Sequence, residues 1–390
     1  RNIKSALTGT FICLSVWLIP SCFGRRRMGS SMKVATIALL PGDGIGPEVT
    51  AAASSVLKAV EDRFGHTFDL QTYAVGGAAL DAGYPPLPNE TLEGCLGADG
   101  IFLGAVGHPK FDGKAPEERP EAAILKLRRE LGAFANLRPA RVWPGLENGG
   151  SLKPEVVKGV DILVVRELTG GLYYGQPRGV AEDGQSAFNT MRYSVEEIER
   201  IATVAFESAR LRGKRVTSVD KANVLETSRL WRKVVTDAGK RYPDIELSHE
   251  YVDACALLIA SKPDRYDVIL TENLFGDILS DESGAIVGSL GLLPSASVGG
   301  KVGLFEPVHG SAPDIANENK ANPIGAIGSA AMLLRHSLKL DIEATAVEQA
   351  IGDTLAAGFR TVDLVPMDNK PPVGSKAMTT AIIEQFHAAA

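Results

Sequence analysis

Short apolar segments alternate along this chain with longer segments whose apolar residues recur at helical spacing, and no other feature restricts the fold as much. Short β-branched runs are typical of buried strands, and longer periodic stretches are typical of helices. Their alternation over 390 residues predicts an α/β protein with open sheets and room for two domains. We expect strands within 32–40, 97–107, 159–168, 214–220 and 266–272, and helices at 47–64, 119–134, 194–212 and 322–338.

Residues 1–31 differ in composition from the rest of the chain. They contain Arg1, Lys4, the arginines at 25–27, no acidic residue and an apolar run at 11–19. That run is shorter than the ~20 apolar residues that span a bilayer. We expect the segment to be extraneous or a targeting segment, with the structured body beginning at Met32. The whole chain has a formal net charge of −6, and the segment carries +5, which leaves −11 on the body.

The acidic body argues against nucleic acids and anionic membranes as partners, because both attract basic surfaces. A small anionic substrate remains compatible if basic residues gather locally. The body contains two cysteines, Cys95 and Cys255, and both lie in apolar runs. Their spacing is neither that of a disulfide framework nor that of a thiolate metal site. A reducing, cytoplasmic location is therefore expected.

The segment LLPGDGIGPEV, residues 39–49, joins the first expected strand to the first expected helix. Phosphate groups often bind at such a point, on the N-terminus of the helix. However, the glycines at 42, 44 and 46 give G-x-G-x-G instead of the dinucleotide-binding G-x-G-x-x-G, and Asp43 would repel a pyrophosphate. We therefore predict a tight strand-to-helix turn beside a cleft, and not a Rossmann nucleotide loop.

Three arginines lie where an anionic substrate could bind. Arg128 is near the end of an expected helix, Arg138 follows in ANLRP, and Arg166 closes the strand at 159–168. Ligands of open α/β sheets bind at the carboxyl ends of strands, and guanidinium groups pair with carboxylates through two hydrogen bonds. Together the three could hold a dicarboxylate, whereas any one of them alone is more typical of a surface salt bridge.

Carboxylates supply a second candidate site. In TENLFGDILSDESG, residues 271–284, Asp277 and Asp281 are four positions apart and share one helix face. Asp253 stands at the start of another apolar helix. Three such carboxylates without a Cys/His pattern suit Mg²⁺ or Mn²⁺. The alternatives are a solvated acidic face neutralised by lysine or arginine, and a helix cap in the case of Asp253.

Six segments resemble, in family order, the β-decarboxylating dehydrogenases of the isocitrate/isopropylmalate dehydrogenase family: LLPGDGIGPEV, LRRELGAFANLRP, VRELTGGLYYG, SVDKANVLE, FGDILSD and FEPVHGSAPDIA. The likeness extends from about Met32 to the C-terminus. It implies two open-sheet α/β domains flanking a cleft, with a sheet unlike the Rossmann one. The cofactor-side domain would combine 32–133 with 288–390, and the second domain would be 134–287, with an arm at 173–194 used in a homodimer.

The same resemblance assigns roles to individual residues. Tyr173 and Lys221 would be catalytic, and Ile124 would face the group on C3 of the substrate. In the homodimer, Lys221 and Asp253 would reach the active site of the other subunit. The dicarboxylate substrate would be bound by Arg128, Arg138, Arg166 and Asp253, and the metal ion by Asp253, Asp277 and Asp281.

The loop at 308–323 would wrap the adenosine half of the nucleotide, as the resemblance implies. Asp314 would accept hydrogen bonds from the free ribose hydroxyls and repel a 2′-phosphate, so NAD is expected in preference to NADP. Cofactor binding is expected from Glu121, His309, Gly310, Ser311, Ala312, Pro313, Asp314, Ile315 and Asn322.

The activity implied by the resemblance is the metal-assisted, NAD-dependent oxidative decarboxylation of 3-isopropylmalate to 4-methyl-2-oxopentanoate and CO₂, a step of leucine biosynthesis. Tartrate, isocitrate and homoisocitrate are alternative substrates within the family. A non-catalytic regulatory subunit would be expected to lack Tyr173, Lys221 or one of the aspartates, and all are present. The contributions of His108 and Glu272 are not predicted.

Overall fold

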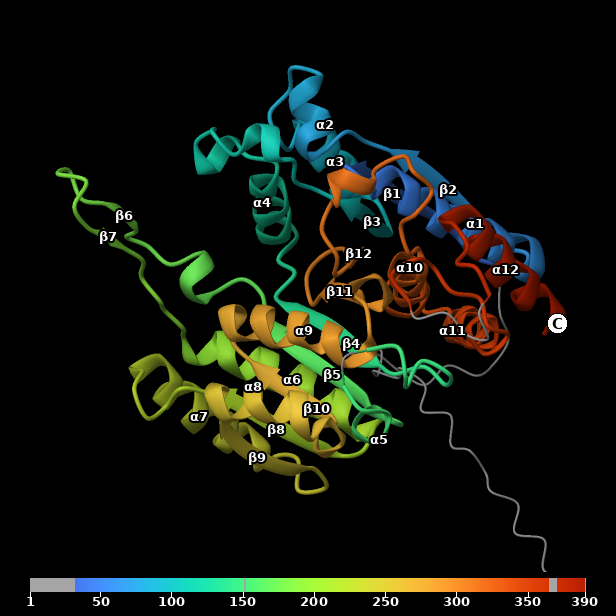
Figure 1. Cartoon of the computed structure of the whole chain (residues 1–390). Coiled ribbons are helices and arrows are strands. Elements are labelled where there is room, and N and C mark those ends of the chain that lie inside the picture. Colours follow the sequence, from blue (N-terminus) through green and yellow to red (C-terminus); the bar gives the residue numbers. More distant parts are fainter. Residues whose placement is uncertain (1–31, 151, 365–369, 390) are drawn as a thin grey trace, which may run out of the picture.

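The computed structural model describes residues 32–150, 152–364 and 370–389. The predictions for residues 1–31 lie outside these ranges. The described chain folds around one mixed sheet (Figure 1), in which ten strands follow the order β2-β1-β3-β12-β11-β4-β5-β10-β8-β9. These strands are β1 (Val34–Gly42), β2 (Thr67–Thr72), β3 (Gly100–Ala105), β4 (Ala135–Arg141), β5 (Asp161–Glu167), β8 (Arg215–Asp220), β9 (Glu246–Tyr251), β10 (Val268–Thr271), β11 (Pro294–Val298) and β12 (Leu304–Pro307).

Antiparallel strands in the middle of this sheet join two parallel halves. On one side β1 pairs in parallel with β2 and β3, and on the other β5, β10, β8 and β9 are parallel. Between them β11 runs antiparallel to both β12 and β4, and β4 runs antiparallel to β5. The predicted α/β fold is confirmed, and each of the five expected strands is present. The pairing of β4 with β11 makes the sheet continuous, however, where the sequence predicted two open sheets.

Helices pack on the two halves of the sheet in separate groups. Beside the β1 half, α1, α10, α11 and α12 pack together, and beside the other half α6 packs on α7 and α8 on α9. Residues 324–335 of α10 are all buried, as its nearly apolar sequence predicts. The helices are α1 (Gly46–Phe64), α2 (Gly76–Asp81), α3 (Asn89–Gly97), α4 (Glu121–Leu131), α5 (Pro154–Val157), α6 (Val195–Arg210), α7 (Glu226–Gly239), α8 (Val252–Ser261), α9 (Asn273–Val287), α10 (Ile324–His336), α11 (Asp341–Ala356) and α12 (Ser375–Ala388).

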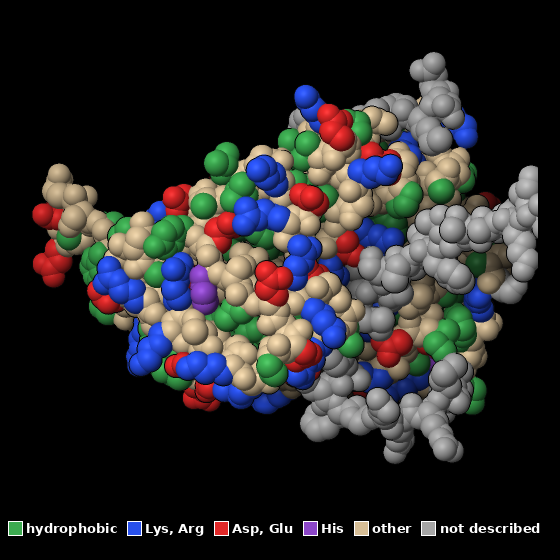
Figure 2. Space-filling model, turned by 90° about the horizontal axis from the view of Figure 1, so that it is seen from below, with side chains coloured by type: hydrophobic (Ala, Val, Ile, Leu, Met, Phe, Trp, Pro, Cys, Tyr) green, Lys and Arg blue, Asp and Glu red, His purple; other side chains and the backbone are tan. Residues whose placement is uncertain are grey.

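The segment 173–194 projects from the body as a long hairpin (Figure 1), in which β6 (Gly179–Val180) pairs with β7 (Ala187–Phe188). On the face seen from below, basic side chains are interspersed with acidic and apolar ones (Figure 2). Such exposed charges contribute little to stability individually. Among the described residues, no helix combines the length and apolar character needed to cross a bilayer.

Candidate active site

Helix α9 places Asp277 and Asp281 against the strands that carry two of the arginines. The helix begins directly after β10, and Glu272 caps it by accepting hydrogen bonds from the backbone N–H groups of residues 274 and 275 at 3.0 and 2.8 Å. A carboxylate at this position also suits the positive end of the helix dipole. Because α9 packs on β4 and β5, side chains four residues apart on that face meet the arginines of these strands.

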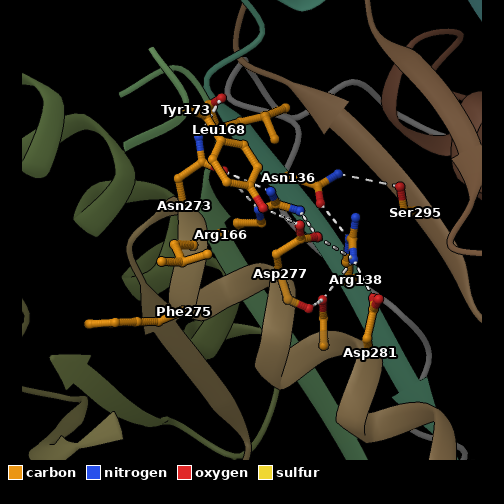
Figure 3. Close-up of polar contacts among 12 residues, drawn as sticks. Asn136, Arg138, Arg166, Leu168, Tyr173, Asn273, Phe275, Asp277, Asp281 and Ser295 are labelled. Carbon is orange, nitrogen blue, oxygen red and sulfur yellow. Dashed lines mark hydrogen bonds and ion pairs between the residues drawn. The ribbon is translucent and has the colours of Figure 1, made fainter. Parts of the chain in front are cut away.

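Asp277 lies at the centre of a cluster of polar side chains (Figure 3). Its carboxylate forms an ion pair with Arg166 and lies 3.4 Å from Nη1 of Arg138, and the Tyr173 hydroxyl donates to its Oδ2 at 2.6 Å. The same Nη1 of Arg138 lies 3.0 Å from Oδ1 of Asp281. Within one chain, therefore, both aspartates are neutralised by arginines. This is the arrangement that the sequence analysis gave as the alternative to a metal site.

Burial and charge together set the protonation states of this cluster. Burial opposes ionisation of Asp277, but Arg166 and Arg138 still hold the pKa of its carboxyl below the usual value. For Asp281, burial outweighs the effect of Arg138 and raises the pKa. Burial and the hydrogen bond to Asp277 raise the pKa of Tyr173 to about 12, and burial beside Arg138 lowers the pKa of Arg166 to about 10. At neutral pH, Asp277 is thus ionised and Tyr173 carries its proton.

Arg128, in the last turn of α4, completes the group of three arginines. It forms an ion pair with Glu306 of β12 at 2.6 Å, and its Nε atom is buried without a hydrogen-bond partner among the described residues. Besides burial, the charge of Arg128 lowers the pKa of both Arg138 and Arg166, so the three guanidinium groups lie near one another. Ile124 is half-buried one turn earlier on α4, on the same helix face as Arg128.

Lys221 and Asp253 form a second, separate group. Lys221 follows β8, Asp253 lies in the first turn of α8, and their side chains pair with each other. Within the described part of the chain, no three His, Cys, Asp or Glu side chains converge as metal ligands. The expected metal site combines Asp253 of one subunit with Asp277 and Asp281 of the other, so it concerns two copies of the chain and stays a prediction.

The loops expected to bind the cofactor meet at the end of β3. Glu121 begins α4 and Ser311 follows β12, and both approach Gly107. A Cβ added there would lie 2.8 Å from Oε1 of Glu121 and 3.8 Å from Oγ of Ser311. Nδ1 of His309 lies 2.9 Å from the carbonyl oxygen of Gly310, and its Nε2 is buried without a partner in the described structure. Burial lowers the pKa of His309, so the imidazole is neutral at neutral pH.

The rest of the predicted cofactor loop turns through a short 3₁₀ helix, η6 (Pro313–Ile315). Asp314 is exposed on this turn. Lys320, the basic residue that follows it in the loop, pairs with Glu318 at 2.6 Å. Asn322 is buried and anchors the end of the loop at the start of α10 through hydrogen bonds.

The glycine-rich segment 41–46 forms the tight strand-to-helix turn that the sequence predicts. Gly44 has a φ of 58°, and a Cβ added to it would lie 1.9 Å from the carbonyl oxygen of Ser311, so this approach requires glycine. Asp43 is buried and accepts hydrogen bonds at 2.8–2.9 Å from three backbone N–H groups, those of Gly77, Ala78 and Gly107. The turn thereby joins the loops at 107 and 311 into one unit.

Three residues of the site were missed by the sequence analysis. Oδ1 of Asn136 accepts from Nε of Arg138 at 2.7 Å, and Oδ1 of Asn273 accepts from Nε and Nη2 of Arg166 at 3.1 and 2.7 Å. Glu306 is the third, as the partner of the remaining arginine. A single Asn or Glu forms no recurring pattern. The signal for Asn273 was its position directly after a buried strand, at the carboxyl edge of the sheet.

Comparison with known proteins identifies the family of the chain. A family model described as isocitrate/isopropylmalate dehydrogenase matches residues 36–385. Relatives described as 3-isopropylmalate dehydrogenase, from Gloeobacter violaceus and Aquifex aeolicus, are 53% and 51% identical over 357 residues, covering 90% and 91% of this chain and 98% of each relative. An isocitrate dehydrogenase structure from Methylococcus capsulatus matches with a TM-score of 0.80 at 36% identity, covering 90% of this chain and 99% of that one. A β-decarboxylating dehydrogenase structure from Thermococcus kodakarensis gives 0.73 at 36% identity, covering 90% and 96%. The chain belongs to the isocitrate/isopropylmalate dehydrogenase family.

Proposed function

We propose that this chain catalyses the NAD-dependent oxidative decarboxylation of 3-isopropylmalate to 4-methyl-2-oxopentanoate and CO₂ in leucine biosynthesis. The observation that carries the proposal is the cluster around Asp277, in which a protonated tyrosine, an ionised carboxylate and two guanidinium groups lie together. That combination suits a dicarboxylate whose loss of CO₂ leaves a carbon to be protonated. The identity above 50% with relatives described as 3-isopropylmalate dehydrogenases supports the same substrate.

A charge balance supports the binding of a divalent cation with the substrate. The three arginines are balanced in the free chain by three carboxylates, those of Glu306, Asp277 and Asp281. A dianionic malate alone would leave uncompensated negative charge in a partly buried site, which is unfavourable. One divalent cation bound together with the malate would restore neutrality.

Asp277 and Asp281 would supply ligands for this cation. Carboxylate oxygens one helical turn apart are the hard donors that Mg²⁺ and Mn²⁺ prefer, and these ions commonly keep water or substrate oxygens as further ligands. One chain contributes two of the three expected carboxylates, and Asp253 of a second copy would be the third. The ion pairs that Asp277 and Asp281 form with the arginines would be exchanged for the cation on binding.

The chemistry divides between the bound groups and the side chains. When bound, the nucleotide would supply the acceptor for the hydride of C2, and a cation held by Asp277 and Asp281 would supply the positive charge that favours the 2-oxo group. Lys221 of a second copy would accept the proton of the C2 hydroxyl, directly or through water. After CO₂ leaves, Tyr173 would donate its proton to C3. Its pKa, raised to about 12, retains that proton at neutral pH, and the 2.6 Å hydrogen bond to Asp277 orients the hydroxyl.

A homodimer would complete the site. Helices α8 and α9 expose Leu257 and Ile278, of which 70% and 56% are accessible. These apolar side chains lie on the same helices as the proposed metal ligands, and a second copy packed there would bury them. The arm at 173–194 would extend the contact. The same packing would bring the Lys221 and Asp253 side chains to the partner's arginine cluster.

Two domains would meet within the continuous sheet. Strand β4 falls in the proposed domain 134–287, and β11 falls in the proposed domain formed by 32–133 and 288–390. The two domains would rotate relative to each other about this antiparallel pair of strands. Closure of the domains by such a rotation would carry α4 and the cofactor loop toward α9.

NAD is the expected nucleotide, because Asp314 is exposed on the cofactor loop and Lys320 is already engaged by Glu318. Replacing Asp314→Lys together with Ile315→Tyr removes the repulsion of a 2′-phosphate and adds a cation for it. We expect the ratio of kcat/KM for NADP⁺ to that for NAD⁺ to rise by about tenfold or more, equivalent to about 1.4 kcal/mol. A wild type that prefers NADP⁺, or an unshifted ratio in the double variant, would contradict the assignment.

The group on C3 decides between substrates of this family. Ile124 offers alkyl surface one turn before Arg128, so an isopropyl group would bury apolar area worth about 1.5–3 kcal/mol. The additional carboxylate of isocitrate would lose its hydration there without a partner, at a cost of several kcal/mol. The alkyl surface therefore favours 3-isopropylmalate over isocitrate.

The experiment that tests the function measures NADH formation from 3-isopropylmalate, isocitrate, homoisocitrate and tartrate, with and without EDTA. We expect 3-isopropylmalate to give the highest kcat/KM and EDTA to abolish turnover, with recovery on addition of Mg²⁺ or Mn²⁺. Comparable values for isocitrate, tartrate as the best substrate, or full activity in EDTA would refute the proposal.

A further inference from the structure

One buried amide connects a substrate-binding arginine to the loop that carries the catalytic tyrosine. Asn273, the first residue of α9, is fully buried. Its Oδ1 accepts two hydrogen bonds from Arg166, and its Nδ2 donates to the backbone carbonyl oxygens of Leu168 and Gly170 at 3.1 Å each (Figure 3). All four hydrogen-bonding positions of the amide are occupied. Its orientation is fixed as well, because the reversed amide would direct N–H groups at a guanidinium.

Asn273 is itself held in place by two buried side chains. Its backbone N–H donates to the hydroxyl of Tyr193 at 3.0 Å, and that hydroxyl donates to Oε2 of Glu272 at 3.3 Å. Tyr193 also packs on the loop after β5, since a Cβ added to Gly170 would lie 2.7 Å from its ring. The loop is therefore enclosed between the ring of Tyr193 and the amide of Asn273.

Helix α9 also restricts Arg166 sterically. A Cβ added to Gly276, one turn after Asn273, would lie 2.6 Å from Cγ of Arg166, so the aliphatic part of the arginine rests on the helix backbone. The edge formed by Nε and Nη2 is occupied by Asn273, and Nη1 is directed at Asp277. Arg166 thus has a single orientation in which to meet a substrate carboxylate.

The neutrality of Asn273 is part of this arrangement. Asp277 already supplies a negative charge to Arg166, and a second carboxylate at position 273 would compete with the carboxylate of a substrate. An amide satisfies the hydrogen-bonding edge of the guanidinium and leaves its charge available. A buried guanidinium without such a partner would be strongly unfavourable.

We propose that Asn273 is a positioning residue that holds Arg166 and the loop before Tyr173 in one fixed relation, so that substrate binding and proton donation depend on the same side chain. Tyr173 ends the short 3₁₀ helix η3 (Gly171–Tyr173), which starts directly after the anchored Gly170. A displacement of that carbonyl would therefore move the tyrosine hydroxyl relative to C3. The proposal rests on the proposed function for the roles of Arg166 and Tyr173.

The test is a double-mutant cycle of wild type, Asn273→Ala, Tyr173→Phe and the double variant, assayed with the 3-substituted malate that the wild type oxidises fastest. Asn273→Ala should lower kcat and raise KM for the malate by about tenfold or more each, while KM for NAD⁺ changes less than about twofold. In the Tyr173→Phe background, Asn273→Ala should lower kcat by less than about threefold, because the tyrosine hydroxyl that Asn273 is proposed to position is already absent.

Thr354→Ala is the matched control for a general loss of stability. Thr354 is fully buried in α11, and its hydroxyl donates to the carbonyl oxygen of Ala350 at 2.7 Å. This control should lower the Tm while leaving kcat and both KM values within about twofold of wild type.

Asn273→Asp is the second variant, to be used if Asn273→Ala does not fold. It has nearly the same shape and keeps an acceptor for Arg166, but it cannot donate to Leu168 and Gly170. Its kcat should therefore stay at least about fivefold below wild type. Equal losses of kcat in both backgrounds of the cycle, or wild-type kcat in Asn273→Asp, would overturn the proposal. A wild type that prefers another malate would refute the proposed substrate and leave the cycle informative.

Discussion

The two groups of expected active-site residues differ in how completely one chain builds them. Arg138 and Arg166, whose side chains are 10% and 1% exposed, are each held by several partners around Asp277. Lys221 and Asp253 have side chains that are 27% and 67% exposed, and they pair with each other. We infer that the chain preorganises the half of the site that binds substrate carboxylates and donates a proton. The half that, on the proposed function, would accept a proton and complete the metal site would need another chain to bury it.

The physical reason for the difference is the cost of desolvation. A buried guanidinium that lost its partners would be strongly unfavourable, so Arg166 is supplied with both Asn273 and Asp277. The exposed pair of Lys221 and Asp253 exchanges with water readily and stabilises the free chain little. Such a pair can separate when a second copy offers each side chain a different partner.

The largest effect is expected from removing the charge at the centre of the cluster. Asp277→Asn should lower kcat by about 10²-fold or more and abolish its dependence on Mg²⁺ or Mn²⁺, because a metal ligand is lost. Direct titration with Mn²⁺ would show weakened binding independently of turnover. Glu282→Gln on the same helix is the control, since Glu282 is half-buried and is not among the ion-pair partners that Arg128, Arg138 and Arg166 have in the described structure. Unchanged turnover and Mn²⁺ affinity in Asp277→Asn would rule out the metal-site assignment.

A somewhat smaller effect is expected from the proton donor. Tyr173→Phe retains the ring, which lies beside Arg166, and removes the hydroxyl that donates to Asp277. Because general acid catalysis is typically worth ~10²–10⁴ in rate, kcat should fall about 10²-fold while KM for the malate changes less than about threefold. Steady-state kinetics would measure the large loss of kcat and the small change in KM. A variant within about twofold of wild-type kcat would exclude Tyr173 as the acid.

The smallest effect is a difference in the pH dependence of stability between the two groups. The pKa of Asp277 is lowered in the folded chain, so its ionised form contributes stability above the unfolded pKa of about 3.9, and that contribution is lost as the pH falls through the folded pKa. In EDTA, the free energy of unfolding should therefore fall more steeply below pH ~5 for wild type than for Asp277→Asn. Asp253→Asn should change this slope less, because that carboxylate is exposed. Denaturant titrations over the acid range would measure all three proteins, and equal slopes for wild type and Asp277→Asn would contradict the account.

Local patterns in the sequence predicted much of this arrangement. Arg166 was recognisable because it closes an apolar strand, and the aspartates at 277 and 281 because they are four positions apart on a helix. Both inferences concern residues near one another in the chain. The family resemblance was needed to assign roles, since spacing alone favoured a neutralised acidic face, and arginines do face these aspartates in one chain.

Long-range pairing was harder to predict. Leu137 of β4 pairs with Ala296 of β11, and this contact turns two expected sheets into one. Likewise, Asn273 meets Arg166 across more than a hundred residues of chain, and neither position alone indicates the hydrogen bonds. Such contacts depend on the packed fold, and a single sequence contains no periodicity that reports them.

The most direct measurement of the central claim uses hybrid dimers. A copy carrying Lys221→Ala lacks the proposed proton acceptor. A copy carrying Asp277→Asn lacks the central carboxylate of the arginine cluster. Each variant alone should therefore be inactive. Co-expression with two different affinity tags and purification through both would isolate dimers that contain one copy of each. If active sites are shared between subunits, one site of the hybrid combines two intact halves, and about half of the wild-type activity per dimer should return. A hybrid as inactive as its parents would show that each chain builds its own site, and would contradict the account.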